Sequence, residues 1–200
     1  MAAEIDVDPA REWTPLMPRA PERVTIAVIS ECAAPDDSDN YGASEQSLFD
    51  RTTLGAFAAA GLTCASLTEL RDHGVHMTVA VRHPKTAATI RASTMKQYAA
   101  TLADELAQMP NARVYVLMGD VAIAAVNNIA RQRTGQRVIP AGSTYRIRGG
   151  TYTLDGIRVI PSYLQAGPAW YVEASKRQMI AEDLAAALRI AGIIASEDHT

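Results

Sequence analysis

The segment RVIPSYLQAGP, from Arg158 to Pro168, is the part of the sequence that says most about the fold. A turn at Asp155-Gly156 precedes it, and its apolar beginning predicts a short strand that stops at Pro161. A long helical pattern begins near Trp170. In open α/β sheets, ligands bind where a strand's carboxyl end meets the next helix, so this loop is a candidate site. The alternative is a plain strand-to-helix connection with its Tyr-Leu pair packed in the core.

The rest of the chain alternates strand-like and helix-like patterns. Apolar runs predict three further strands at residues 23–30, 75–81 and 113–118. Helical spacing predicts long helices at residues 44–61, 93–109, 121–131 and 170–190. Residues 137–160 read as a β-rich stretch with turns at Gly149-Gly150 and Asp155-Gly156. This alternation predicts an α/β fold, a three-layer α/β/α sandwich around a central, mostly parallel sheet.

The chain length predicts one main domain, because 200 residues are enough to bury a full core. Four prolines among acidic residues indicate an extended N-terminal arm over residues 1–22. The domain itself is expected over residues 23–194, and residues 195–200 read as a frayed tail.

The charge of the chain is unevenly distributed. The net charge of -3 and pI near 5.8 give no overall nucleic-acid signal. Residues 1–50 hold eleven acidic residues against three arginines, whereas residues 131–177 hold eight basic residues against two acidic ones. The basic excess can face phosphates, or it can be a solvated hairpin face.

Several classes of protein are disfavoured by composition. The two cysteines are far apart and the four histidines show no ligand spacing, so neither a disulfide framework nor a metal site is expected. No apolar run has the length of a membrane span, and the acidic N-terminus is unlike a signal peptide. A cytoplasmic protein is expected.

Three positions carry candidate chemistry. Glu31 is the first carboxylate after a buried strand, where it can act as a general base or orient water, or be an ordinary loop acid. Gly119-Asp120 forms a strand-to-helix turn in which Asp120 suits an N-cap and backbone amides can bind an anion. Arg82-His83 ends the second strand, where His83 is either a pocket group or a surface residue.

The order of several motifs resembles the uracil-DNA glycosylase superfamily over about Val24 to Ala191. SECAAP at residues 30–35 is similar to the family's first motif, and MTVAVRHP at 77–84 to its Thr-Asn-Val-Val-Lys-Cys-Arg-Pro segment. VLMGDVA at 116–122 resembles its Leu-Leu-Gly-x-x-Ala turn. IPSYL at 160–164 lies where the family has His-Pro-Ser followed by an apolar residue.

The resemblance implies an enzyme that flips a damaged base out of DNA and hydrolyses its N-glycosidic bond through an oxocarbenium-like sugar, without metal or cofactor. Glu31 would activate or orient the water. The implied base-pocket positions are Tyr41 (as stacking aromatic), Thr78, Arg82, His83 and Ile160. The implied DNA contacts are Ser162, the wedge Tyr163-Leu164-Gln165, Arg146, Arg148 and Lys176.

The sequence also departs from the family pattern. Ile160 replaces the histidine that stabilises the leaving base, and such a donor is worth roughly 10²–10³ in rate. Thr78 replaces the asparagine that reads the uracil edge, and the four iron–sulfur cysteines are absent. These departures leave three alternatives. The first is a glycosylase of altered base specificity, in which His83 or a backbone amide replaces the lost donor. The second is a catalytically silent protein that binds nucleic acid or nucleotides, and the third is an unrelated small-molecule enzyme that uses the Gly119-Asp120 turn. The acidic loop at 36–39 opposes DNA docking and suggests a protein partner.

Overall fold

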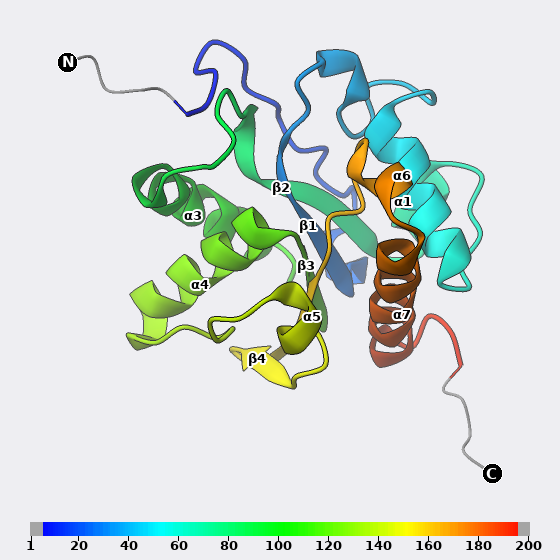
Figure 1. Ribbon diagram of the computed structural model, residues 1–200. Helices are drawn as coiled ribbons and strands as arrows, with labels where there is room; N and C mark the ends of the chain where they lie inside the picture. The colour runs from blue at the N-terminus through cyan, green and yellow to red at the C-terminus, as the bar shows by residue number, and fades with distance from the viewer. Residues whose placement is uncertain (1–5, 196–200) are drawn as a thin grey trace.

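The structure is a computed structural model that describes residues 6–195. It is an α/β fold in which helices flank a central five-stranded sheet of order β2-β1-β3-β5-β4 (Figure 1). The strands are β1 (Ile26–Ala33), β2 (Val75–Pro84), β3 (Val114–Met118), β4 (Tyr152–Leu154) and β5 (Ile157–Ser162). All neighbouring pairs are parallel except β4 with β5. The predicted three-layer arrangement around a mostly parallel sheet is therefore confirmed.

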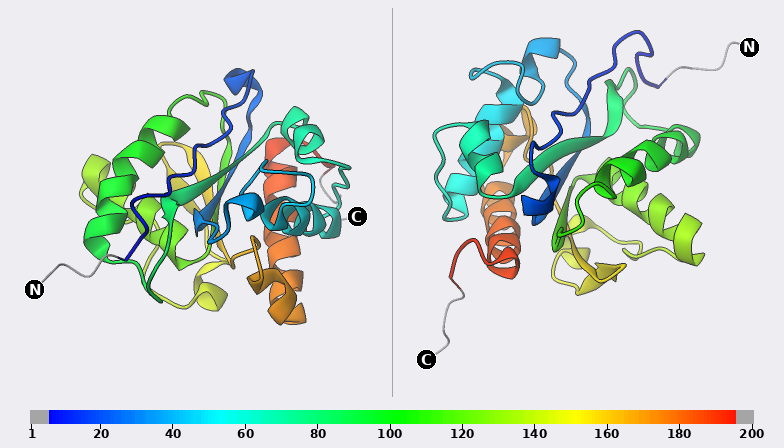
Figure 2. Two further views of the ribbon diagram at one scale, coloured as in Figure 1. Left: turned by 90° about the horizontal axis from the view of Figure 1, so that it is seen from above. Right: turned by 180° about the vertical axis from the view of Figure 1, so that it is seen from behind.

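Two sets of helices cover the two faces of the sheet, as Figure 2 shows from above. The helices are α1 (Leu48–Ala59), α2 (Leu67–Asp72), α3 (Ala92–Leu106), α4 (Asp120–Thr134), α5 (Thr144–Ile147), α6 (Ala169–Val172) and α7 (Ala174–Ala191). Short 3-10 turns lie at η1 (Pro21–Arg23) and η2 (Asp37–Asp39). Helices α1, α2 and α7 pack on one face, and α3 and α4 pack on the other.

The alternation of side chains along β1 assigns each residue to a face. Successive side chains of a strand point to opposite sides of the sheet. Ile26 and Val28 belong to the core under α1 and α7, whereas Ala27 and Ile29 belong to the core under α3 and α4. Glu31 continues the second series, so it emerges on the α4 side where β1 reaches the carboxyl edge of the sheet.

Strand β5 runs through Pro161 instead of ending there, which corrects the prediction. Pro161 pairs with Leu117 of β3, and Ser162 pairs with Met118. Within residues 6–195, strand β4 pairs only with residues 157–159 of β5, and no strand pairs with Pro161 on that side. A proline is tolerated where its missing N–H has no ladder partner to lose. The strand therefore carries Ser162 into the sheet rather than into the loop.

The predicted β-rich stretch at 137–160 is only partly correct. Its first half is irregular chain plus α5, because the Asn127 side chain on α4 holds that backbone. The Asn127 Oδ1 accepts from the amides of Val138 and Ile139 at 2.9 and 2.8 Å, and its Nδ2 donates to the Ile139 carbonyl at 3.0 Å. The β4–β5 hairpin does form, with positive φ of 53° at Asp155 and 83° at Gly156.

The helical pattern near Trp170 is split into two helices. Glu173 has φ of −133°, which ends α6 and begins α7. The Arg177 side chain donates to the carbonyls of Trp170 and Tyr171 at 3.2 and 3.5 Å and so satisfies part of the exposed end of α6. The break places α6 over the carboxyl edge of the sheet (Figure 1).

The described part of the N-terminal arm runs along the carboxyl end of β2. The Asp8 amide donates to the Pro84 carbonyl at 2.9 Å, and the Trp13 amide donates to the Arg82 carbonyl at 2.8 Å. Val7 forms an antiparallel bridge with Lys85. These bonds join the arm to the edge strand of the sheet, which otherwise has free backbone groups.

Asp6 fixes the arm to the start of α3. Its carboxylate accepts from the Arg91 amide at 2.6 Å and from the Thr94 hydroxyl at 2.8 Å. Burial raises its pKa, but these hydrogen bonds and the Arg91 side chain outweigh burial and lower the pKa of Asp6 from 3.8 to about 2. Asp6 therefore caps a helix whose own N-cap, Arg91, supplies no side-chain acceptor.

Two of the predicted segments extend beyond the residues that the structure describes. Residues 1–5 of the predicted arm and residues 196–200 of the predicted tail lie outside the described residues. Within residues 6–195, none of the helices combines the length and the apolar character that crossing a bilayer requires.

Candidate functional site

Glu31 occupies the centre of the carboxyl edge of the sheet, next to the start of α4. Its Oε1 accepts from the Val121 amide at 3.3 Å, and its Oε2 lies 3.9 Å from the Lys85 Nζ. The side chain is 16% exposed, so it is held by protein yet reachable from solvent. The amide end of α4, which the sequence suggested as an anion site, therefore contacts a carboxylate of the chain itself.

Gly119 makes room for the Glu31 carboxylate. Its backbone has φ of 98° and ψ of 171°, a combination that residues with a Cβ rarely adopt. A Cβ on Gly119 would lie 2.8 Å from both Cγ and Cδ of Glu31, and closer still to Oε1. Gly119, rather than the predicted Asp120, is the N-cap of α4, and Asp120 is its first helical residue.

Two cavities meet at Glu31 and Asp120. The first has a volume of about 370 Å³ and reaches toward Tyr163, Leu164 and Lys176. The second, of about 340 Å³, extends on the other side toward the loop after β2 and is more apolar. A site of this size with two carboxylates, an aromatic ring and an ammonium group suits a small planar polar ligand.

An aromatic and basic rim surrounds the first cavity. The Lys176 Nζ lies 5.4 Å from the centre of the Tyr163 ring and 2.8 Å from Oε1 of Glu173. Tyr145, Tyr171 and Val172 are exposed close by on α5 and α6, at 70%, 59% and 74%. Val172 itself lines the cavity. Exposed rings beside basic groups are typical of surfaces on which nucleobases stack.

Tyr41 is enclosed rather than available for stacking. It is 1% exposed, and its hydroxyl shares a hydrogen bond of 2.8 Å with Ser30. The Gln165 Nε2 donates to the Tyr41 oxygen at 2.9 Å and to Thr53 at 3.3 Å. Burial raises the pKa of Tyr41 to about 12. Gln165, predicted as part of a wedge, is fully buried in this network, so neither residue faces a ligand.

The other predicted base-pocket residues also lie away from the first cavity. Thr78 is fully buried, and Ile160 is 4% exposed within the core under α7. Arg82 pairs with Glu105 at 3.0 Å, as does buried His76 at 2.8 Å. Burial raises the pKa of Glu105, but the bonds from these two side chains help to lower it overall. This cluster joins β2 to α3.

His83 is covered by the N-terminal arm. Its Nδ1 lies 3.0 Å from the Asp8 carbonyl, and its ring packs against Tyr98 at 5.3 Å between centroids. The side chain is nearly buried, at 8%. Among the described residues that line the two cavities there is no histidine, so His83 does not replace the missing donor there.

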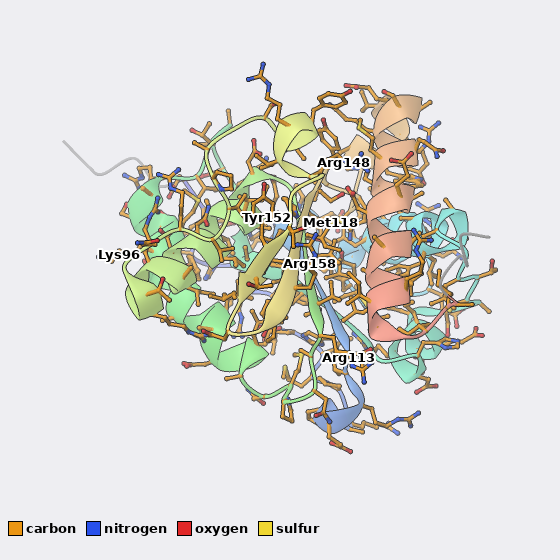
Figure 3. The ribbon with its side chains drawn as sticks, turned by 90° about the horizontal axis from the view of Figure 1, so that it is seen from below. Lys96, Arg113, Met118, Arg148, Tyr152 and Arg158 are labelled. Atoms are coloured by element: carbon orange, nitrogen blue, oxygen red, sulfur yellow. The ribbon has the colours of Figure 1, made fainter. Side chains whose placement is uncertain are left out.

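Ser162 and Arg148 join β5 to α7 instead of meeting phosphates. The Ser162 hydroxyl donates to Asp183 Oδ2 at 2.6 Å. Arg148 pairs with Asp183 at 2.8 Å and with Glu182 at 2.9 Å, and it lies beside α7 in Figure 3. Burial raises the pKa of Asp183, although Arg148 and Ser162 oppose the rise. Arg146, two residues earlier, is exposed.

Much of the predicted basic face is used within the molecule. Arg158, labelled in Figure 3, donates to the carbonyls of Tyr152 and Gly150, and Arg133 pairs with Asp155. The acidic loop at 36–39 is also partly neutralised, because Arg11 pairs with Asp37 at 2.6 Å.

Sequence reasoning missed the role of Lys85. It is the first residue after β2 and lies 3.9 Å from Glu31, because neighbouring parallel strands end at the same edge. The position directly after a buried strand was the available signal. Sequence reasoning also expected no ligand pattern among cysteines and histidines, whereas Cys64 and His73 are close in space.

The fold and the site together define an α/β protein with a carboxylate-bearing cavity at the carboxyl edge of a parallel sheet. Comparison of the sequence with models of known protein families and with curated proteins finds no match.

Proposed function

We propose that the protein is a base glycosylase that hydrolyses the N-glycosidic bond of a flipped, damaged base in DNA, with Glu31 as the group that orients or activates water. The observation that carries the proposal is the position of Glu31. It is fixed between the first turn of α4 and a cavity of about 370 Å³ that bears an aromatic ring and an ammonium group. The motif resemblance to uracil-DNA glycosylases favours the same reaction.

The charge of the cavity suits an oxocarbenium-like transition state. Positive charge develops on the sugar as the base leaves, and fixed negative groups stabilise it most when water is excluded. Glu31 and Asp120 both line the cavity. Oε1 of Glu31 accepts from the Val121 amide, whereas Oε2 has the Lys85 ammonium 3.9 Å away, beyond hydrogen-bond distance, so Oε2 is the oxygen that would accept a proton from water.

The base would enter beside Tyr163 rather than Tyr41. Tyr163 and Leu164 line the cavity and are half-buried, so they can stack on a base or fill the gap it leaves. Lys176 can donate to the departing base or to a phosphate, a role that the enclosed Ile160 cannot perform. This arrangement predicts a specificity different from that of the uracil enzymes.

The experiment is a base-release assay on labelled oligonucleotides. The panel carries uracil, hypoxanthine, xanthine, mismatched thymine and oxidised pyrimidines in single and double strands. Wild type, Glu31→Gln and the matched surface control Asp104→Asn are compared. Release by wild type and the control, but not by Glu31→Gln, supports the proposal. Release that persists unchanged in Glu31→Gln removes Glu31 from the mechanism.

A second candidate function is a catalytically silent binder of nucleic acid or nucleotides. The observation that favours it is the burial of Ile160, Thr78 and Tyr41, which leaves the family's base-reading positions without access to a ligand. This candidate predicts binding whose affinity falls steeply with salt, with no base released from any substrate. Weakened binding in Tyr163→Ala and Lys176→Gln would locate that surface at the same cavity.

A further inference from the structure

Three metal-binding side chains converge at the end of the sheet opposite to Glu31. The Cys64 sulfur, a Glu69 carboxylate oxygen and a His73 ring nitrogen all lie within 4.8 Å of one another. Cys64 lies in the loop before α2, Glu69 is on α2, and His73 directly follows that helix. Residues four apart on a helix share a face, so Glu69 and His73 are brought together by α2 itself.

The thiol and the imidazole are both available. Cys64 is only 9% exposed, yet within the described chain neither its sulfur nor the His73 ring has a hydrogen-bond partner. A nearly buried thiol that faces a free imidazole and a carboxylate is an unusual arrangement for a purely structural cysteine. It is a typical arrangement for a metal ligand set.

The carboxylate is already oriented by a second contact. Glu69 Oε2 accepts from the Ala65 amide at 2.7 Å, and the Ser66 hydroxyl accepts from the Glu69 amide at 3.2 Å. The pattern resembles a capping box, except that the carboxylate accepts from Ala65, the residue before the N-cap Ser66, and it fixes the start of α2. It leaves Oε1 of Glu69 free, and outer contacts of this kind hold a ligand in place for a metal ion.

We propose that Cys64, Glu69 and His73 bind a divalent zinc-like cation, with water or another molecule's ligand in the fourth position. Tetrahedral zinc needs ligand atoms about 3.6 Å apart, given zinc–ligand distances of about 2.0–2.3 Å. His73 is exposed and its ring has no hydrogen-bond partner within the described residues, so rotation of this side chain can close the remaining distance. Thiolate and imidazole together favour zinc over calcium or magnesium.

The cation would stabilise the fold rather than join the reaction. His73 is followed by Gly74, whose carbonyl accepts from the Ile26 amide at 3.1 Å, where β1 and β2 begin. Glu31 lies at the carboxyl ends of these same strands. Binding would tie the loop before α2 to the start of β2, so it is independent of the proposed glycosylase activity.

The test is a titration of the full chain with Co²⁺ as a spectroscopic probe, followed by displacement with Zn²⁺. We expect one Co²⁺ per chain, a thiolate-to-cobalt charge-transfer band, and visible bands of tetrahedral intensity. Zn²⁺ should abolish these bands and raise the melting temperature by a few degrees, since a ligand that binds only the folded state stabilises it.

Variants identify the ligands. Cys64→Ser should remove the charge-transfer band, whereas Cys32→Ser, a change at the other buried cysteine, should leave it intact. Glu69→Gln keeps an acceptor for the Ala65 amide and should weaken binding at least tenfold. His73→Asn should weaken binding as much, while the neighbouring Asp72→Asn should not. A folded wild type without a charge-transfer band, or a band that survives in Cys64→Ser, would overturn the proposal.

Discussion

Replacing Gly119 with alanine should damage the fold and the site together. The backbone at Gly119 has φ of 98° and ψ of 171°, so any side chain there is strained by about 1–3 kcal/mol. A Cβ would also lie 2.8 Å from Cγ and Cδ of Glu31, which forces that side chain to move. Movement breaks the 3.3 Å bond from the Val121 amide, which fixes the carboxylate beside the cavity.

The two costs can be separated with a double-mutant cycle. Glu31→Ala removes all the Glu31 atoms that the new Cβ would meet, but it leaves the backbone strain unchanged. Gly119→Ala should therefore cost about 2–4 kcal/mol in the wild-type chain and about 1 kcal/mol less in the Glu31→Ala chain. Urea unfolding of the four proteins measures both values. Equal costs in the two backgrounds would refute the contact between Gly119 and Glu31.

Three further predictions concern stability. Asp6→Asn should lower the free energy of unfolding by about 2 kcal/mol near neutral pH, because the pKa of Asp6 is about 2 in the folded state against an ordinary value of 3.8. The stability advantage of the wild type should be complete above about pH 4 and should disappear as the pH falls through about 2. Urea unfolding of both proteins across this pH range tests the prediction. Tyr41→Phe should cost about 1–3 kcal/mol, since Ser30 and Gln165 each lose a buried partner, and a change under 0.5 kcal/mol would contradict that network. Arg148→Met should cost about 3 kcal/mol near neutral pH by leaving Asp183 uncompensated. Because burial raises the pKa of Asp183, this cost should shrink as the pH is lowered toward its titration, and a pH-independent cost would exclude the mechanism.

The strands and their order along the chain were predictable because they are short apolar runs closed by turn residues. Glu31 could be placed at the carboxyl edge for the same reason, although the strand continues to Ala33 and Glu31 lies within its last residues instead of after it. The irregular chain after α4 was not predictable. Its conformation depends on Asn127, a residue whose amide binds backbone more than ten positions away.

Whether the predicted base-pocket residues are exposed to a ligand could not be predicted from the motifs. Tyr41 and Gln165 lie 124 positions apart, and only their packing between α1 and β1 reveals that they hydrogen-bond to each other rather than to a ligand. His83 is a comparable case, because the N-terminal arm covers it. A motif fixes the position of a side chain along a strand or loop, whereas its exposure depends on distant segments of the chain.

The most direct test of the central claim is a single-turnover rate on the best substrate of the base-release panel. For Glu31→Gln we predict a rate at least about 100-fold below wild type, with DNA affinity changed by less than about threefold, because general base groups contribute this much without holding the substrate. Asp104→Asn should match wild type. Folded wild-type protein that releases no base from any substrate, or Glu31→Gln that retains the wild-type rate, would contradict the account.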